Sequence, residues 1–125
     1  MGRNPVGWFE IYVSDIEKSA RFYEQVLGVT LTALPAPVDE LKMMAFPMQQ
    51  GASGAAGAIC QMQGVPAGGN STLVYFTCDD CATEAARIEP AGGKLMKPKF
   101  SIGEYGFIAI ASDPDGNMLG LHSRQ

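Results

Sequence analysis

The sequence contains only one histidine, His122, and this scarcity excludes several kinds of chemistry. A structural zinc site needs about four close ligands. Beyond the Cys78 and Cys81 pair, the chain offers one further cysteine and this single imidazole. The P-loop pattern, the dinucleotide-binding glycine pattern and the G-x-S-x-G nucleophile elbow are also absent. We therefore expect no structural zinc site, and no nucleotide-phosphate or acyl-transfer chemistry by those routes.

Long apolar runs and clusters of basic residues are lacking as well. No apolar stretch reaches the roughly 18 residues that a membrane span needs, and the N-terminus has no signal-peptide-like apolar segment. The net charge is -4 and the sequence isoelectric point is near 4.8, which argues against a nucleic-acid or anionic-membrane partner. We expect a soluble cytoplasmic protein with a neutral or cationic small molecule as its partner.

The three cysteines are Cys60, Cys78 and Cys81. An odd number in a chain without a secretion signal favours free thiols in a reducing compartment. Cys78 and Cys81 form a C-x-x-C at a strand-to-helix junction, where a helix N-terminus can lower a thiol pKa and support redox chemistry. Strand parity turns Cys78 away from the concave face, so two buried small residues are the favoured interpretation and a redox pair is the alternative.

The sequence pattern indicates that the same strand-helix unit occurs twice, with Asp15 and Asp80 at matching places 65 positions apart. Chance similarity between two ordinary strand-helix units is the alternative. A strand over 6–13 is followed by Asp15 as helix N-cap and by a helix that ends at Gly28. A strand over 72–78 is followed by Asp80 and a helix over about 81–89. Such periods are the first test of architecture, and they predict paired modules with function in the cleft between them.

Turn residues divide the rest of each copy into three short strands. These strands are expected near 29–34, 41–47, 56–62, 93–99, 106–111 and 117–122. Asp113–Asn117 is interpreted as the final hairpin turn. The fold class is α+β with two tandem βαβββ modules. The expected layout is a single domain over 1–125, with module one over about 6–63, a linker over about 64–70 and module two over about 71–123.

The run from Phe9 to Gly28, with Val13-Ser14-Asp15, Phe22-Tyr23 and Leu27-Gly28, resembles the opening signature of the vicinal oxygen chelate superfamily. This superfamily includes glyoxalases, bleomycin-resistance proteins and extradiol dioxygenases. Asp79-Asp80 followed by Ala91-Gly92-Gly93, and the Asp113–Asn117 run, are similar to parts of its second module. The resemblance covers nearly the whole chain. It implies a glyoxalase-like fold with curled mixed sheets around a cleft, often in a homodimer, but it does not fix a reaction.

The resemblance also implies where metal ligands would lie. Metal-dependent members carry His and Glu on inward-facing positions of the first and last strand of each module. The corresponding residues here are Trp8, Leu73, Gly120 and a position near Ala58. None of these side chains can coordinate a divalent cation. We expect no cofactor and no family-type metal site; a cation held by Glu10 and His122 with water and substrate oxygens is the alternative.

Two polar residues share strand parity with the missing ligands. Glu10 lies two positions after Trp8, and His122 lies two positions after Gly120. A nearby carboxylate can orient an imidazole and raise its pKa, as in a general acid or base, so Glu10 and His122 are the candidate catalytic pair. The alternatives are a solvated Glu10 at an open cleft mouth and a surface His122 near the end of the chain.

An apolar and aromatic lining is typical of a pocket for an organic ligand, although each such residue could equally be plain core. The candidate ligand-binding residues are Trp8, Tyr12, Leu73, Tyr75, Thr77, Tyr105 and Gly120. Tyr105 belongs to the Ile102–Gly106 segment, which is interpreted either as a mobile rim that contacts ligand or as an ordinary exposed loop.

Three functional hypotheses remain open at this stage. The leading one is a metal-independent superfamily member that binds a small organic molecule in the cleft, for sequestration or resistance. The second is a glyoxalase-like lyase or isomerase, or a dioxygenase-type enzyme, that uses Glu10 and His122. The third is a non-catalytic structural or regulatory dimer whose own side chains fill the cavity.

Overall fold

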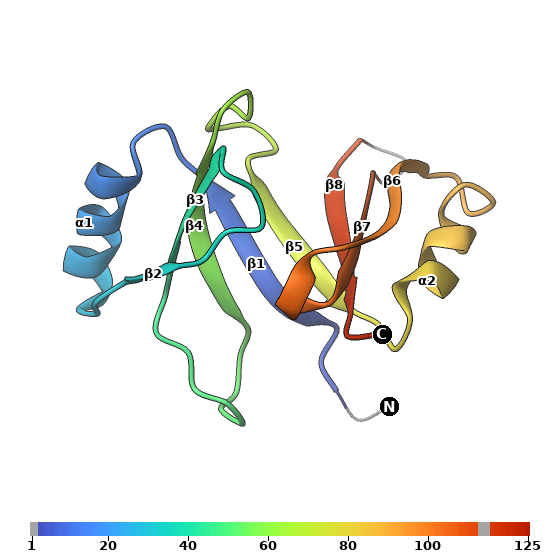
Figure 1. Cartoon of the computed structure of the whole chain (residues 1–125), viewed down its shortest axis with the longest axis horizontal. Coiled ribbons are helices and arrows are strands. Elements are labelled where there is room, and N and C mark those ends of the chain that lie inside the picture. The colour runs from blue at the N-terminus through green and yellow to red at the C-terminus, as the bar shows by residue number, and fades with distance from the viewer. Residues whose placement is uncertain (1–2, 113–115) are drawn as a thin grey trace. The chain divides into compact units, whose positions relative to one another are not determined.

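The structure is a computed structural model that describes residues 3–112 and 116–125 (Figure 1). The described chain runs through β1 (Val6–Tyr12), α1 (Ile16–Leu27), β2 (Thr32–Leu34), β3 (Leu41–Ala45) and β4 (Ala56–Met62). It continues through β5 (Thr72–Thr77), α2 (Cys81–Ile88), β6 (Lys94–Ser101), the short 3-10 helix η1 (Gly103–Tyr105), β7 (Phe107–Ser112) and β8 (Met118–Ser123). The βαβββ order occurs twice, which confirms the predicted α+β class and its two tandem modules.

The chain divides into two compact units. One spans Phe9–Thr72, and the other combines the residues up to Trp8 with those from Leu73 onward. The division falls inside β1, so the first residues of this strand pack with the second half of the chain. No helix in the described part of the chain has the length and apolar character needed to cross a bilayer.

In the Phe9–Thr72 unit the hydrogen-bonded strand order is β2-β3-β4-β1. The β2–β3 and β3–β4 pairs are antiparallel. Helix α1 lies beside β2, β3 and β4 (Figure 1). Ile16 and Ala20 of α1 form a buried core with Leu31 and Ile59. These core residues follow the helical and strand periods of the sequence, which place them on one face of their elements.

Helix α1 begins and ends where its local sequence predicts. The carboxylate of Asp15 accepts a hydrogen bond from the Lys18 backbone N–H at 3.2 Å. At the other end Gly28 has a φ of 68°, and its N–H donates to the Glu24 carbonyl at 2.8 Å. Glycine adopts this left-handed conformation without a Cβ clash. Both predicted caps are confirmed.

In the second unit the strand order is β5-β8-β7-β6. The β5–β8 pair is parallel and brings Tyr75 opposite Gly120 and Thr77 opposite His122. The β7–β8 and β6–β7 pairs are antiparallel, so the sheet is mixed. Helix α2 lies beside β6 and β7 (Figure 1), and its core side chains pack against Ala109.

The predicted final turn at Asp113–Asn117 includes residues 113–115, which lie outside the described residues. The strands on either side of it, β7 and β8, are antiparallel neighbours from Phe107 opposite Ser123 to Ser112 opposite Met118.

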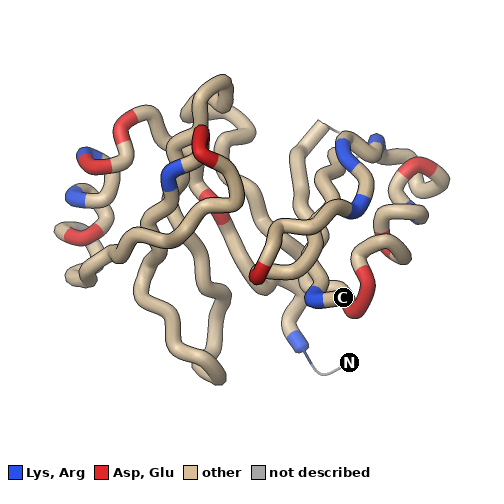
Figure 2. Tube along the Cα trace, viewed as in Figure 1, with Lys and Arg blue, Asp and Glu red and all other residues tan. Residues whose placement is uncertain are grey.

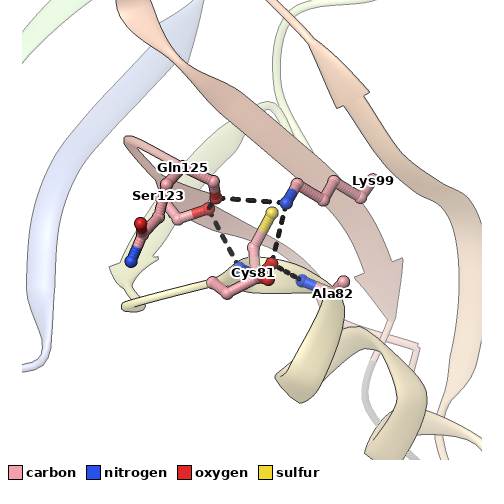
Figure 3. A network of polar contacts seen from close by, with 6 residues as sticks. Cys81, Ala82, Lys99, Ser123 and Gln125 are labelled. Carbon is pink, nitrogen blue, oxygen red and sulfur yellow. Dashed lines mark hydrogen bonds and ion pairs between the residues drawn. The ribbon is translucent and has the colours of Figure 1, made fainter.

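The two helices begin with the same side-chain contact, which supports the predicted duplication. The Ile16 N–H at the start of α1 donates to Gln61 Oε1 of β4 at 2.9 Å. The Cys81 N–H at the start of α2 donates to Ser123 Oγ of β8 at 2.9 Å (Figure 3). In each unit a side chain of the last strand therefore accepts from an otherwise unbonded N–H of the first helical turn.

A second contact repeats at the helix ends. Glu24 Oε2 accepts from the Leu31 N–H at 2.8 Å, and Glu89 Oε2 accepts from the Leu95 N–H at 3.4 Å. The two glutamates lie 65 positions apart, like the two N-cap aspartates. Each module thus ties the end of its helix to the strand segment that follows.

Charges of both signs are spread along α1, and lysines mark β6 (Figure 2). These lysines are Lys94, Lys97 and Lys99. Because β6 ends the strand order of its unit, it is an edge strand. Lysines on an edge strand oppose pairing with another chain.

Candidate functional site

Glu10 of β1 is a buried carboxylate, with 8% of its surface exposed. The phenol of Tyr12, two residues further on the same strand face, donates a hydrogen bond to Glu10 Oε1 at 2.9 Å. Burial, and then the charge of Glu10, raises the pKa of Tyr12 above its ordinary value. The phenol therefore keeps its proton at neutral pH and acts as the donor. The interpretation of Glu10 as a solvated acid does not match this arrangement.

Cys60 of β4 is a neighbour of this pair that sequence reasoning left out of the site. Its side chain is fully buried. Burial, and then the charge of Glu10, raises the pKa of the Cys60 thiol, so the thiol stays protonated at neutral pH. Strand alternation could have identified this residue, because Cys60 lies two positions after Ala58 just as His122 lies two positions after Gly120.

Gly120 leaves room for the aromatic ring of Tyr75. A Cβ placed on Gly120 would overlap three ring atoms of Tyr75, its neighbour across the parallel β5–β8 pair. Tyr75 is itself buried, with 6% of its surface exposed. The ring therefore occupies the space into which a side chain at position 120 would extend. This is the place where the resemblance implies a Glu ligand in metal-dependent relatives.

His122 of β8 is half-buried and bonded to the backbone of η1. Its Nε2 lies 2.6 Å from the carbonyl oxygen of Tyr105. A carbonyl oxygen only accepts, so Nε2 carries a proton, and in the neutral form of the ring the lone pair lies on Nδ1. The His122 carbonyl in turn accepts from the Cys78 N–H at 2.8 Å. His122 is thus built into the sheet, in contrast to the surface residue of the alternative interpretation.

The Ile102–Gly106 segment is a closed turn around η1. The Ile102 N–H donates to the Gly106 carbonyl at 2.8 Å, and the Gly106 N–H donates to the Gly103 carbonyl at 3.1 Å. Burial, and then the neighbouring Glu104, raises the pKa of Tyr105. The segment contacts β8 through the His122 bond, which neither the rim nor the loop interpretation included.

The predicted site residues fall into both units. Within one unit the structure joins Glu10 to Tyr12; within the other it joins Tyr75 to Gly120, and His122 to Tyr105. The remaining candidates all belong to the second unit: Leu73 is buried, and Trp8 and Thr77 are half-buried. The pairing of Glu10 with His122 stays a prediction.

The residues at the implied ligand positions do not fit a divalent metal. Leu73 and Ala58 are apolar and buried, and the indole of Trp8 can only donate. Gly120 has no side chain, and the Tyr75 ring covers its place. Among residues 3–112 and 116–125, no three His, Cys, Asp or Glu side chains gather into a metal-binding group.

The C-x-x-C pair lies in the core of its unit. Cys78 and Cys81 pack with Ala85, Ala109 and Leu121. Burial, and then the charge of a nearby glutamate, raises the pKa of Cys78 to about 11. A redox-active thiol needs a lowered pKa. The structure therefore agrees with the favoured interpretation of buried core residues.

Two open cavities lie in the Phe9–Thr72 unit. One, of about 400 Å³, is mainly apolar, with Phe9, Tyr23, Leu27 and Phe46 in its lining. The other, of about 350 Å³, has Glu40, Lys42 and Gln61 in its lining. Neither is lined by Glu10 or Tyr12, which lie on the other face of β1 from Phe9.

Comparison with known proteins agrees with the fold and with the motifs. Residues 6–121 match the profile of the Glyoxalase/Bleomycin resistance protein/Dioxygenase superfamily. The chain belongs to this superfamily. The match covers both modules and confirms the resemblance drawn from the Phe9–Gly28 and Asp79–Gly93 motifs.

Curated relatives of this superfamily member include a mycobacterial protein named "Putative glyoxylase CFP32", from Mycobacterium bovis and from Mycobacterium tuberculosis. Each is 28% identical over 115 residues, which are 91% of this chain and 42% of the relative. The chain therefore spans about two fifths of the length of the curated relatives it matches.

Solved structures with the same fold include methylmalonyl-CoA epimerase from Mycobacterium tuberculosis, with a TM-score of 0.71, 13% identity and coverage of 97% of this chain and 88% of that one. The hypothetical protein BH1468 from Bacillus halodurans has a TM-score of 0.72 at 9% identity, with coverage of 96% and 94%. A variant of Streptomyces coelicolor methylmalonyl-CoA epimerase in complex with 2-nitronate-propionyl-CoA has a TM-score of 0.67 at 13% identity, with coverage of 94% and 95%. Identities this low establish the glyoxalase-like fold alone.

Proposed function

We propose that this superfamily member binds a small organic molecule without the divalent metal that many of its relatives hold. The observation that carries the proposal is the Tyr75 ring packed over Gly120. An aromatic ring in the place of a carboxylate removes oxygen atoms that could coordinate a metal, and it adds apolar surface. Such surface is typical of a site for an organic ligand, in which a few polar groups fix orientation.

The polar groups of the proposed site are mainly acceptors. Glu10 offers a carboxylate, and its phenol partner Tyr12 already donates to it. The lone pair on Nδ1 of His122 is a second acceptor. With a net charge of -4, these groups favour a neutral or cationic molecule that carries N–H or O–H donors. Trp8, Leu73 and Thr77, which belong to the same unit as His122, are proposed to line the site.

The test combines metal analysis with ligand binding by the purified full chain. We expect substoichiometric Zn, Ni, Mn and Fe, and a rise in the unfolding temperature with phenethylamine, a cationic aromatic amine. Because Trp8 is the only tryptophan, its fluorescence reports binding. Glu10→Gln removes the charge but keeps an acceptor for Tyr12, and should weaken binding by about tenfold or more, since a hydrogen bond to a charged group contributes about 1.5–3 kcal/mol.

Glu40→Gln is the matched control, because Glu40 is exposed in the same unit. It should bind phenethylamine as the unmodified protein does. Failure of phenethylamine and of a wider metabolite screen to stabilise the fold or change Trp8 fluorescence would overturn the proposal. Equal weakening by both substitutions would assign binding to general charge rather than to Glu10.

A second candidate function is an enzyme of the lyase, isomerase or dioxygenase type. It is favoured by the His122 contact, because an imidazole with its proton on Nε2 presents the base form on Nδ1. In this case His122→Asn should abolish turnover of a glyoxalase-type substrate, whereas loss of the Tyr105 contact should lower the free energy of unfolding by only about 1 kcal/mol. A stoichiometric metal that is lost in Glu10→Gln or His122→Asn would establish the metal-dependent form of this alternative.

We also propose that the protein acts as a cytoplasmic homodimer, as the superfamily resemblance implies. Light scattering after size-exclusion chromatography should give about twice the 13.3 kDa mass of the chain. A dimer that binds no compound in the screen would favour the third hypothesis, a structural or regulatory protein.

A further inference from the structure

We propose that the Ile102–Gly106 turn fixes a proton on Nε2 of His122, so that the neutral form of the ring is the Nε2–H tautomer and a ligand donates an N–H or O–H group to Nδ1. The tautomer follows from the geometry of one unit alone. The claim that a ligand meets Nδ1 rests on the proposed function, and it narrows the ligand to molecules with a hydrogen-bond donor.

The contact itself determines the tautomer. The separation of 2.6 Å between Nε2 and the Tyr105 carbonyl oxygen is shorter than the usual N–H···O distance of about 2.9 Å. Two acceptors at this distance would repel each other, so Nε2 must carry the proton.

The backbone holds the Tyr105 carbonyl in place. Gly106 has a φ of 104°, and a Cβ there would overlap the carbonyl oxygen of Ser123, the residue after His122. Only glycine therefore lets the turn lie this close to β8. The Ile102 N–H closes the turn on the Gly106 carbonyl at 2.8 Å. The Tyr105 side chain takes no part in this bond, which makes Tyr105→Phe an informative control.

The first experiment is nuclear magnetic resonance of the imidazole nitrogens in ¹⁵N-histidine-labelled protein. With a single histidine in the chain, the spectrum has no assignment ambiguity. We expect a protonated Nε2, an unprotonated Nδ1 and a slowly exchanging N–H signal, which a free imidazole does not give in water. A proton on Nδ1, or rapid exchange of the Nε2–H, would overturn the proposal.

Substitutions separate the turn from general effects. Gly106→Ala and Gly103→Ala should make the Nε2–H exchange rapidly, whereas Tyr105→Phe should leave it slow. Gly103 has a φ of 72°, and a Cβ added there would meet open space. Gly103→Ala therefore still tests the role of the turn if Gly106→Ala does not fold. Gly28→Ala is the matched control, since Gly28 has a similar φ of 68° in the other unit. Unchanged exchange in both turn variants would refute the role of the turn.

The second experiment compares phenethylamine with phenethyltrimethylammonium, which has the same charge and ring but no N–H donor. We expect tenfold or tighter binding of the amine and a change in the Nδ1 resonance with little change at Nε2. Equal affinities would overturn the acceptor role of Nδ1 while leaving the proposed function in place. Absence of binding by both compounds would overturn the claim that these ligands donate to Nδ1, whereas the proposed function falls only if the wider metabolite screen fails as well. The unliganded spectrum decides the tautomer in either case.

Discussion

At the scale of single residues, the contact between Gly120 and Tyr75 shows how a scaffold position can change its chemical role. The resemblance implies a carboxylate at position 120, and the chain has hydrogen there instead, with an aromatic ring lying over it. Glycine at this place is therefore part of the packing of Tyr75. The two residues act as a pair across the β5–β8 register.

Gly120→Ala should destabilise the protein by about 1–3 kcal/mol, because the added Cβ overpacks against the Tyr75 ring. Urea denaturation gives the free energy of unfolding. In a Tyr75→Ala background the same substitution should cost much less, because the overlapping ring is gone. Equal costs in the two backgrounds would show that the ring does not set the requirement for glycine.

At the scale of secondary-structure elements, the helix starts are the clearest repeated device. Gln61 and Ser123 each reach from a last strand to the first N–H of a helix. Figure 3 shows Ser123 beside Cys81, and Lys99 in the same network. Lys99 Nζ lies 2.8 Å from the N-cap carboxylate of Asp80. This hydrogen bond is the main reason that the pKa of Asp80 is lowered. Strand, helix and edge lysine are thereby joined at one point.

Gln61→Ala and Ser123→Ala should each lower the free energy of unfolding by about 1–3 kcal/mol, because each leaves a helix N–H without its acceptor. Gln63 is exposed and lies two positions after Gln61, so Gln63→Ala should change the free energy of unfolding by less than about 0.5 kcal/mol. Chemical denaturation checks all three. A Gln61→Ala variant as stable as Gln63→Ala would mean that water replaces the Gln61 contact without loss.

At the scale of the whole molecule, buried titratable groups tie global stability to pH. Cys78 has its pKa raised from 9.0 to about 11, mainly by burial. The unfolded chain therefore releases this proton at lower pH than the folded one. The stabilising contribution is complete below about pH 9 and is lost as the pH rises toward 11.

We expect the unfolding temperature to fall as the pH rises from 9 to 11, and Cys78→Ala to flatten that fall. The raised pKa of Tyr12 acts in the same direction, so part of the dependence should remain in the variant. Calorimetry across this range measures both effects. A Cys78→Ala profile parallel to that of the unmodified protein would contradict the assignment.

Features that depend on residues close together in the sequence were predicted correctly, whereas features that depend on residues far apart were not. The caps at Asp15, Gly28 and Asp80 were predictable because a cap depends on a few neighbouring residues. Strand positions followed from alternation and from turn residues. The 3-10 helix at Gly103–Tyr105 was not predicted, because it is held by His122, a residue distant in sequence.

The sequence by itself determined the two α-helices and the strands, their duplicated order, the superfamily, and the residues that stand at the ligand positions implied by the resemblance, since each depends on local pattern or on residue identity. Only the tertiary structure decided that Tyr75 covers Gly120, that Cys60 lies beside Glu10, and that His122 is held by the Tyr105 carbonyl. These contacts depend on strand register and on which backbone approaches a given side chain. A shift of one residue would reverse every strand face, so they are fixed when the chain packs rather than by any short stretch of sequence.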